Sequence, residues 1–107
     1  MKIINLTPHD IVVRTNEGDI TFPKSGDVAR VSTTSKEVGT VDGITVVKTT
    51  FGGVEGLPAH AEDTLYIVSA MVLSAIGGRY DVVAPDTGAT AIRNEKGQIV
   101  AVTRFTA

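Results

Sequence analysis

The feature that most constrains the fold is the spacing of the apolar residues. They occur in short runs rich in Val, Ile and Thr, and each run is ended by Gly, Asn, Asp or Pro. β-branched residues favour strands, and the residues between the runs favour tight turns. The pattern therefore predicts a mainly β (α+β) domain, a small curled sheet or barrel built from hairpins, with one short helix.

The order of runs and turns predicts consecutive hairpins. The Asp42-Gly43 pair suits a primed hairpin turn. The glycine-rich segment Gly52 to Pro58 is expected to be a flexible loop that cannot continue a regular strand, and it serves either as a binding loop or as a connector. Strands are expected at residues 3–6, 11–15, 20–22, 28–33, 45–50, 64–68, 79–84, 91–93 and 99–105.

The segment from Thr64 to Ile76 predicts a central strand followed by a helix. Four consecutive apolar residues at 65–68 are typical of a strand covered on both faces. Ser69 is a suitable N-cap for a helix over 70–76, and Gly77-Gly78 is a suitable stop. This helix is apolar almost all round, so we expect it to be buried or pressed against a partner chain.

The bulk composition restricts the class of protein. The chain has 107 residues, 42% of them hydrophobic, which suits one domain over residues 1–107. It has no cysteine, which excludes disulfides, thiolate metal sites and cysteine nucleophiles and fits a reducing compartment.

Charge and hydropathy argue against two kinds of partner. The net charge is −2 and the basic residues are scattered, so a nucleic acid partner is not expected. No apolar run reaches membrane-spanning length, and Pro8 comes too early for a signal peptide. We therefore expect a cytoplasmic protein that does not bind membranes.

The corner around His9 is the first candidate site. Pro8 fixes a turn that presents His9 and Asp10 at the ends of two strands. A catalytic His9 would need a nucleophile nearby, whereas a cap or hydrogen-bonding role needs none. His9 and His60 lack the spacing of a metal motif, so no metal is expected.

A second candidate lies where the predicted central strand meets the helix. Ser69 is either a simple cap or a ligand contact, since a helix N-terminus offers N–H donors to an anion. Arg79 and Asp81 are two residues apart on a strand and share a face. They either bind a polar ligand or pair with each other.

Several other side chains suit a phosphorylated ligand, although no catalytic constellation or cofactor fingerprint is present. Arginine binds phosphate bidentately, and threonine hydroxyls in a turn donate hydrogen bonds. We therefore expect no enzymatic activity and no cofactor. The candidate ligand-binding residues are Thr7, His9, Asp10, Arg30, Tyr66, Ser69, Arg79, Asp81 and Thr87.

Four spaced motifs carry a resemblance to a known group of proteins. They are N-L-T-P-H-D-I-V-V at 5–13, G-V-E-G-L-P at 53–58, T-L-Y-I-V-S at 64–69 and R-Y-D-V-V-A-P at 79–85. Together they resemble a family of small uncharacterised proteins encoded by phages, prophages and some bacteria. The resemblance covers most of the chain from residue 3 to residue 105.

The resemblance implies a function by analogy. Phage genomes of this kind carry small β-rich proteins that disarm host defence, including sponges that sequester nucleotide signals without cleaving them. It implies a homo-oligomer in the cytoplasm of the infected cell, with arginine neutralising phosphate and Tyr66 or Phe51 stacking on a base. The alternative is a structural or protein-interaction module, such as a virion accessory protein or an inhibitor that docks on a host protein.

Overall fold

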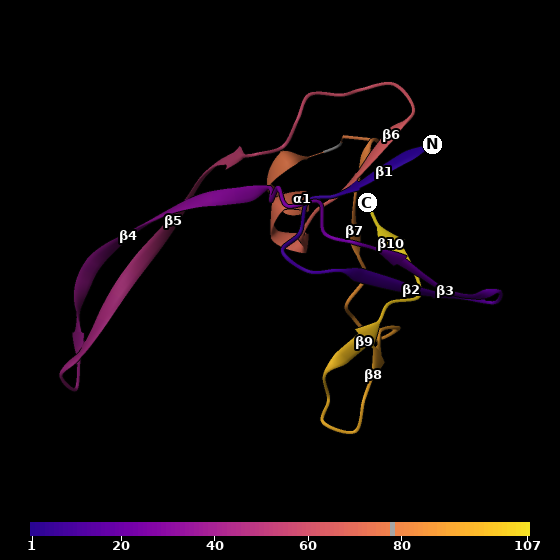
Figure 1. Cartoon of the computed structure of the whole chain (residues 1–107). Helices are drawn as coiled ribbons and strands as arrows, with labels where there is room; N and C mark the ends of the chain where they lie inside the picture. The colour runs from indigo at the N-terminus through magenta and orange to yellow at the C-terminus, as the bar shows by residue number, and fades with distance from the viewer. Residues whose placement is uncertain (78) are drawn as a thin grey trace.

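The computed structural model describes residues 1–77 and 79–107, and within them the chain is mainly β with one short helix. This confirms the predicted fold class. The strands form one four-stranded sheet and three two-stranded sheets rather than a closed barrel (Figure 1). The strands are β1 (Lys2–Asn5), β2 (Ile11–Thr15), β3 (Gly18–Phe22), β4 (Arg30–Val41), β5 (Ile44–Glu55), β6 (Thr64–Ile67), β7 (Val82–Pro85), β8 (Ile92–Arg93), β9 (Ile99–Ala101) and β10 (Phe105–Thr106), and the helix α1 is Ala70–Ile76.

The four-stranded sheet has the order β1-β6-β7-β10. β6 pairs in parallel with both β1 and β7, and β10 closes the sheet antiparallel to β7. The predicted central position of this strand is confirmed, since Tyr66, Ile67 and Val68 are buried. The expectation of consecutive hairpins is wrong here, because β1 and β6 are far apart in sequence and local turn signals do not encode such a pairing.

The core lies between this sheet and α1. Its buried members are Leu6, Ala29, Tyr66, Val68, Val72 and Val82. Ser69 caps the helix by accepting a hydrogen bond from the Val72 backbone N–H at 3.3 Å, as predicted. The helix is not buried on all sides within one chain, because Val72 faces the core while Met71 is 56% exposed, so of the two expectations only contact with a partner chain stays open for the outer side. The predicted stop includes Gly78, which lies outside the described residues.

Two short hairpins flank the core. β2 pairs with β3 in register from Ile11↔Phe22 to Thr15↔Gly18, and β8 pairs with β9. The two hairpins touch, because the Val102 N–H donates to Val12 and the Arg14 N–H donates to Val102. The strand expected at 99–105 is therefore split, with the bridge at Val102 lying between β9 and β10.

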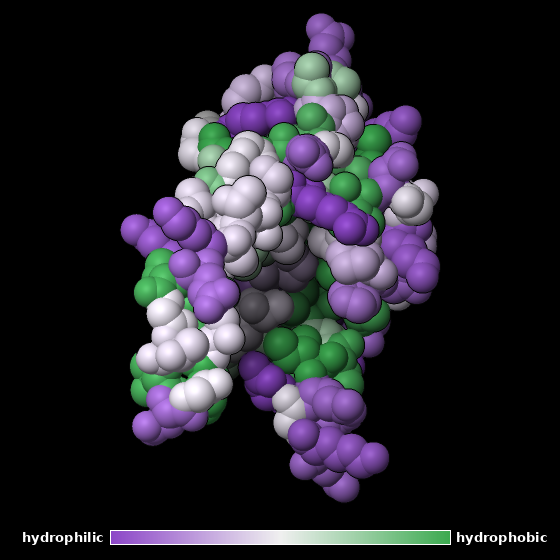
Figure 2. All heavy atoms as spheres, turned by 90° about the vertical axis from the view of Figure 1, so that its left-hand side faces the viewer, coloured by the Kyte–Doolittle hydropathy of each residue, from purple (hydrophilic) through white to green (hydrophobic). Residues whose placement is uncertain are grey.

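The β4–β5 hairpin, residues 30–55, projects from the body of the protein, and we call it the arm (Figure 1). Its strands have 12 residues each. The radius of gyration is 16.7 Å, whereas a compact chain of this length has about 13 Å. Figure 2 shows the molecule from the side toward which the arm projects. On this side hydrophobic patches lie beside residues of intermediate hydropathy, and the surface is hollowed between two projecting parts.

Two predictions for the segment that forms the arm have to be corrected. The expected strand at 28–33 continues to Val41, and β5 runs through the glycine-rich segment as far as Glu55. Gly52 lies within β5 opposite the Ser32 side chain, whose hydroxyl a Cβ atom at Gly52 would displace. The ladder absorbs the irregularity with a register shift between Val31 and Thr33. Only the end of the predicted loop, from Gly56 onward, is outside β5.

The single helix of the described residues has seven residues, which is too short to span a bilayer.

Candidate functional site

The nine candidate residues fall into three separate regions. Thr7, Arg30 and Ser69 line a groove between the N-terminal turn, the start of the arm and α1. His9, Asp10 and Thr87 line a cleft between β2 and β9. Tyr66, Arg79 and Asp81 form a tightly bonded cluster beside β6 and β7.

The Arg79–Asp81 cluster is internally satisfied. The Arg79 guanidinium donates from Nε and Nη2 to the two carboxylate oxygens of Asp81, at 2.9 and 2.6 Å, and from Nη1 to the Pro58 carbonyl at 3.0 Å. The Tyr66 hydroxyl donates to the Ala59 carbonyl at 3.3 Å, and the Arg79 guanidinium lies 6.0 Å from the centre of the Tyr66 ring. Tyr66 is buried, so its ring is not accessible for stacking on a base.

His60 completes this cluster, although its position in the sequence did not indicate such a role. Its Nδ1 lies 3.2 Å from Asp81 Oδ2, and its Nε2 lies 2.8 Å from the Tyr80 hydroxyl. Hydrogen bonds from Arg79 lower the pKa of the Asp81 carboxyl to about 2; burial opposes this effect, and the His60 bond adds to it. The cluster ties the loop at 58–60 to the start of β7, so the pairing alternative for Arg79 and Asp81 is confirmed. The predicted reason for this pairing is wrong, because the strand expected at 79–84 begins only at Val82 and the two residues lie in the turn before β7.

The N-terminal turn is built around Asn5, which the sequence reasoning missed. The buried Asn5 side chain donates from Nδ2 to the His9 and Phe22 carbonyls at 2.8 and 2.9 Å. Its Oδ1 accepts from the Thr7 N–H and hydroxyl. The Thr7 hydroxyl also lies 2.9 Å from the His9 carbonyl, so Thr7 holds the turn together. An Asx-type turn signal, Asn two residues before Thr, was the clue available in the sequence.

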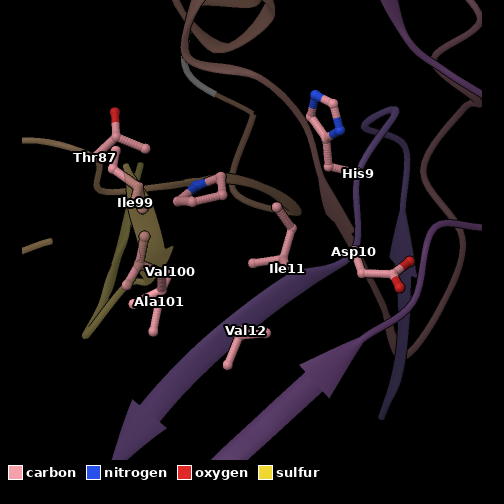
Figure 3. Close-up of a pocket in the computed structure, with 10 residues that line it drawn as sticks. His9, Asp10, Ile11, Val12, Thr87, Ile99, Val100 and Ala101 are labelled. Atoms are coloured by element: carbon pink, nitrogen blue, oxygen red, sulfur yellow. The ribbon is translucent and has the colours of Figure 1, made fainter. Parts of the chain in front are cut away.

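The cleft between β2 and β9 has a volume of about 250 Å³ and mostly apolar walls. Figure 3 shows Ile11 directed toward β9, whereas the carboxylate of Asp10, just before β2, points away from β9. There Asp10 Oδ1 accepts a hydrogen bond from the Lys24 N–H at 2.9 Å. The His9 ring stands at the rim of the cleft, away from the β9 side chains (Figure 3). These polar groups therefore do not converge on one point inside the cleft.

The groove beside α1 has a volume of about 370 Å³, and we call it the Arg30 groove. Arg30, Ser69 and Thr7 are its polar lining residues, and the rest of the wall is apolar apart from backbone. The Ser69 hydroxyl accepts one bond as a cap, and its own hydrogen is available to donate. Its lining consists of Leu6, Thr7, Pro8, Val28, Ala29, Arg30, Val31, Ser69, Met71 and Val72.

Arg30 differs from the other arginines in its partners. Arg14, Arg79 and Arg104 pair with Asp19, Asp81 and Asp86 at 2.6–2.9 Å. Arg93 donates to the Gly97 carbonyl at 2.8 Å. Among the described residues Arg30 makes no ion pair, although Glu55 is its neighbour across the ladder. Arg30 is thus a groove-lining cation that has no carboxylate within ion-pair distance in the described chain.

The composition of the Arg30 groove suits the binding of a small molecule. In the described part of the chain, no three His, Asp or Glu side chains lie together in a way that would hold a metal ion. A groove with a cation at its edge, a hydroxyl and apolar walls is the usual composition of a small-molecule site. Comparison with protein-family models, curated proteins and solved structures gave no match for this chain.

Proposed function

We propose that this protein is a non-enzymatic, homo-oligomeric binding protein that sequesters a small phosphorylated, nucleotide-like ligand in the Arg30 groove. In the phage context that the sequence motifs imply, the ligand is a nucleotide-derived immune signal of the infected cell, and the protein acts as an anti-defence sponge. Capture without cleavage removes such a signal as effectively as hydrolysis does, provided that the protein is abundant and binds tightly.

The observation that carries the proposal is the isolated positive charge of Arg30 at a mostly apolar groove. A guanidinium group forms bidentate, charge-assisted hydrogen bonds with phosphate. The Ser69 hydroxyl lies on the same groove and supplies a further donor, while Pro8, Val28 and Met71 offer an apolar surface to a base or sugar. Glu55 opposes phosphate binding, because it is next to Arg30 across the ladder and its carboxylate weakens the attraction between Arg30 and phosphate.

The groove is shallow on a single chain, which favours a site shared between copies. Small-molecule sites usually enclose most of the ligand surface, and an open groove does not. A second subunit covering the groove would remove the ligand from water and strengthen the contact between Arg30 and phosphate.

Native mass spectrometry is the direct test. The purified protein is measured alone, after incubation with ADP-ribose and with cyclic dinucleotides, and after incubation with extract from bacteria whose nucleotide-signalling defence has been triggered. We expect a discrete oligomer that retains a phosphate-bearing small molecule and releases it unchanged on heating. A protein that remains empty with every probe and every extract contradicts the proposal, and release of a cleaved product contradicts its non-enzymatic part.

A matched pair of arginine variants locates the site. Arg30→Gln should weaken binding about 10- to 100-fold, because it removes hydrogen bonds to a charged group that are worth about 1.5–3 kcal/mol. Arg93→Gln removes an exposed arginine of the β8–β9 hairpin and should leave the affinity unchanged. Equal losses in the two variants would indicate nonspecific charge attraction instead of a site at Arg30.

A second candidate function is supported by the arm, whose exposed apolar side chains are typical of a protein-interaction surface. On this reading the protein is a virion accessory component or an inhibitor that docks on a host protein. Affinity capture from infected cells that yields one host or phage protein in a fixed ratio, with no small molecule bound, would favour this candidate over the first.

A further inference from the structure

The arm exposes more apolar surface than a free hairpin in water tolerates. Six of its Val, Ile and Phe side chains are 39–69% exposed. An isolated two-stranded hairpin is at best marginally stable, and long uncovered strand edges promote association. Only the base of the arm is packed, where Val31 and Val54 adjoin the core. The exposed residues are Val38, Val41, Ile44, Val46, Val47 and Phe51.

The register groups the apolar residues near the tip into one surface. Val41 is directly opposite Ile44, and Val46 is opposite Gly39, which leaves the valine uncovered by its neighbour. Side chains alternate between the faces of a strand, so Ile44 and Val46 share one face. We call Val41, Ile44 and Val46 the tip patch. Thr40 and Thr45 occupy the opposite face, so the end of the tip is amphipathic, whereas Val47 lies on the Thr45 face two residues further along β5.

The same chain carries an apolar groove of matching character. This groove lies between the base of the arm and the outer side of α1, and its volume is about 270 Å³. Phe51 and Met71 border it, and both are more than half exposed. We call it the helix groove, and its lining residues are Val31, Phe51, Met71, Ser74 and Ala75.

We infer that the arm assembles this protein with a second copy of itself: the tip patch of one chain packs into the helix groove of the other, and the exchange is reciprocal. Both surfaces belong to one chain, so a two-fold arrangement satisfies both without any other partner. This inference rests on the proposed function only in that it names the surface through which the copies of the proposed oligomer meet.

Charge permits this pairing between identical arms. The arm carries three cations and three anions, so its formal net charge is zero and two copies do not repel each other. Its charged residues are Arg30, Lys36, Glu37, Asp42, Lys48 and Glu55.

The size of the arm also fits a stable dimer. Twelve residues per strand give a length of about 40 Å, and two strands give a width of about 10 Å, so one face covers roughly 400 Å². In a reciprocal exchange in which the tip patch enters the helix groove and the rest of the arm face lies along the partner, each chain gives one arm face and covers another, which amounts to at most roughly 800 Å² per chain. Specific interfaces bury about 800 Å² per partner.

The arrangement also places the partner next to the proposed ligand site. Val31 and Met71 line both the helix groove and the Arg30 groove. A tip patch seated on Met71 therefore borders the Arg30 groove and narrows its opening to solvent.

Light scattering coupled to size-exclusion chromatography tests the inference over a range of protein concentrations. We expect a discrete oligomer for the unaltered protein. The double substitution Ile44→Thr with Val46→Thr should raise the dissociation constant at least 100-fold, and threonine preserves the β-branched shape that the hairpin needs. The control is Ile20→Thr, which alters a similarly exposed isoleucine on β3, outside the arm, and should not change the assembly.

A mixing experiment separates reciprocal exchange from other uses of the arm. Met71→Glu places a charge in the helix groove and should also give a monomer. A mixture of the Met71→Glu chain with the Ile44→Thr, Val46→Thr chain retains one intact tip and one intact groove, so it should form a heterodimer that neither variant forms alone.

Two results overturn the inference. One is a monomeric unaltered protein at every concentration; the other is an oligomer that the arm variants leave intact. Nucleotide binding by such a protein would still support sequestration in the Arg30 groove, because binding is read out separately by mass, whereas a monomer would contradict the homo-oligomeric part of the proposed function. Conversely, an arm-dependent dimer that binds no nucleotide would support the assembly and contradict the sponge.

Discussion

The guanidinium group of Arg79 and the carboxylate of Asp81 form a two-bond pair, with distances of 2.9 and 2.6 Å, and the carboxylate is buried. The same guanidinium donates to the Pro58 carbonyl, 21 residues earlier in the chain. Two residues that the sequence suggested for ligand binding therefore fasten the loop after the arm to the central sheet. The first two predictions concern the effect of this pair on stability.

Replacing the Asp81 carboxylate should destabilise the fold more than replacing an exposed one. Asp81→Asn should lower the free energy of unfolding by about 2–4 kcal/mol, since it leaves Arg79 without its buried counter-charge. Asp19→Asn is the matched control, because Asp19 makes a similar two-bond pair with Arg14 on the surface, and its effect should be much smaller. Urea unfolding followed by circular dichroism at one fixed protein concentration measures both; similar losses would mean that Asp81 is not specially placed.

Stability should fall in acid as Asp81 becomes protonated. Its pKa is lowered from 3.8 to about 2 in the folded chain, so the folded state favours the ionised form. The contribution, about 2 kcal/mol, is complete above roughly pH 4 and is lost between about pH 4 and pH 2. Comparing unfolding at pH 6 and pH 2.5 should show a smaller loss in Asp81→Asn than in the unaltered protein. Parallel pH profiles for the two proteins would contradict the assignment.

The Asn5 side chain should be important for stability rather than for ligand affinity. Asn5→Ala leaves the buried groups that it bonds, including the Thr7 N–H, without partners, which should cost about 2–4 kcal/mol. Asn94→Ala is the control: the Asn94 side chain bonds three groups, against four for Asn5, but in the exposed β8–β9 hairpin. Thermal unfolding should show a drop of several degrees for Asn5→Ala and little change for Asn94→Ala.

Gly56 should be intolerant of a side chain for two reasons that can be separated. Its φ is +79°, and a Cβ atom there would lie 2.6 Å from the Val28 carbonyl oxygen. Gly97 has nearly the same φ, +78°, with nothing near its Cβ position. Gly97→Ala should therefore cost only the backbone strain, about 1 kcal/mol. Gly56→Ala should cost about 1–3 kcal/mol more, because backbone atoms must move. Equal losses on chemical unfolding would show that the contact with Val28 is unimportant.

The sequence by itself determined the local elements. The Asp42-Gly43 turn, the buried run around Ile67 and the Ser69 cap all lie where the residue pattern predicts them, because each depends on neighbours within a few residues. The pattern also indicated that α1 has more apolar surface than one core contact needs, and Met71 is exposed.

The tertiary structure decided how these elements pair and which side chains remain available. The parallel pairing of β1 with β6 joins residues about 60 positions apart, and turn chemistry carries no information about such pairs. The strand through Gly52 depends on the pairing of β5 with β4, which the glycine-rich segment alone does not indicate. Arg30 and Arg79 differ in their ion pairing because only Arg79 has a carboxylate within ion-pair distance in the described chain. Arg79 has Asp81 as its partner, while Arg30 lines a groove with no ion-pair partner among the described residues, because charge pairing is set by three-dimensional distance and not by residue type.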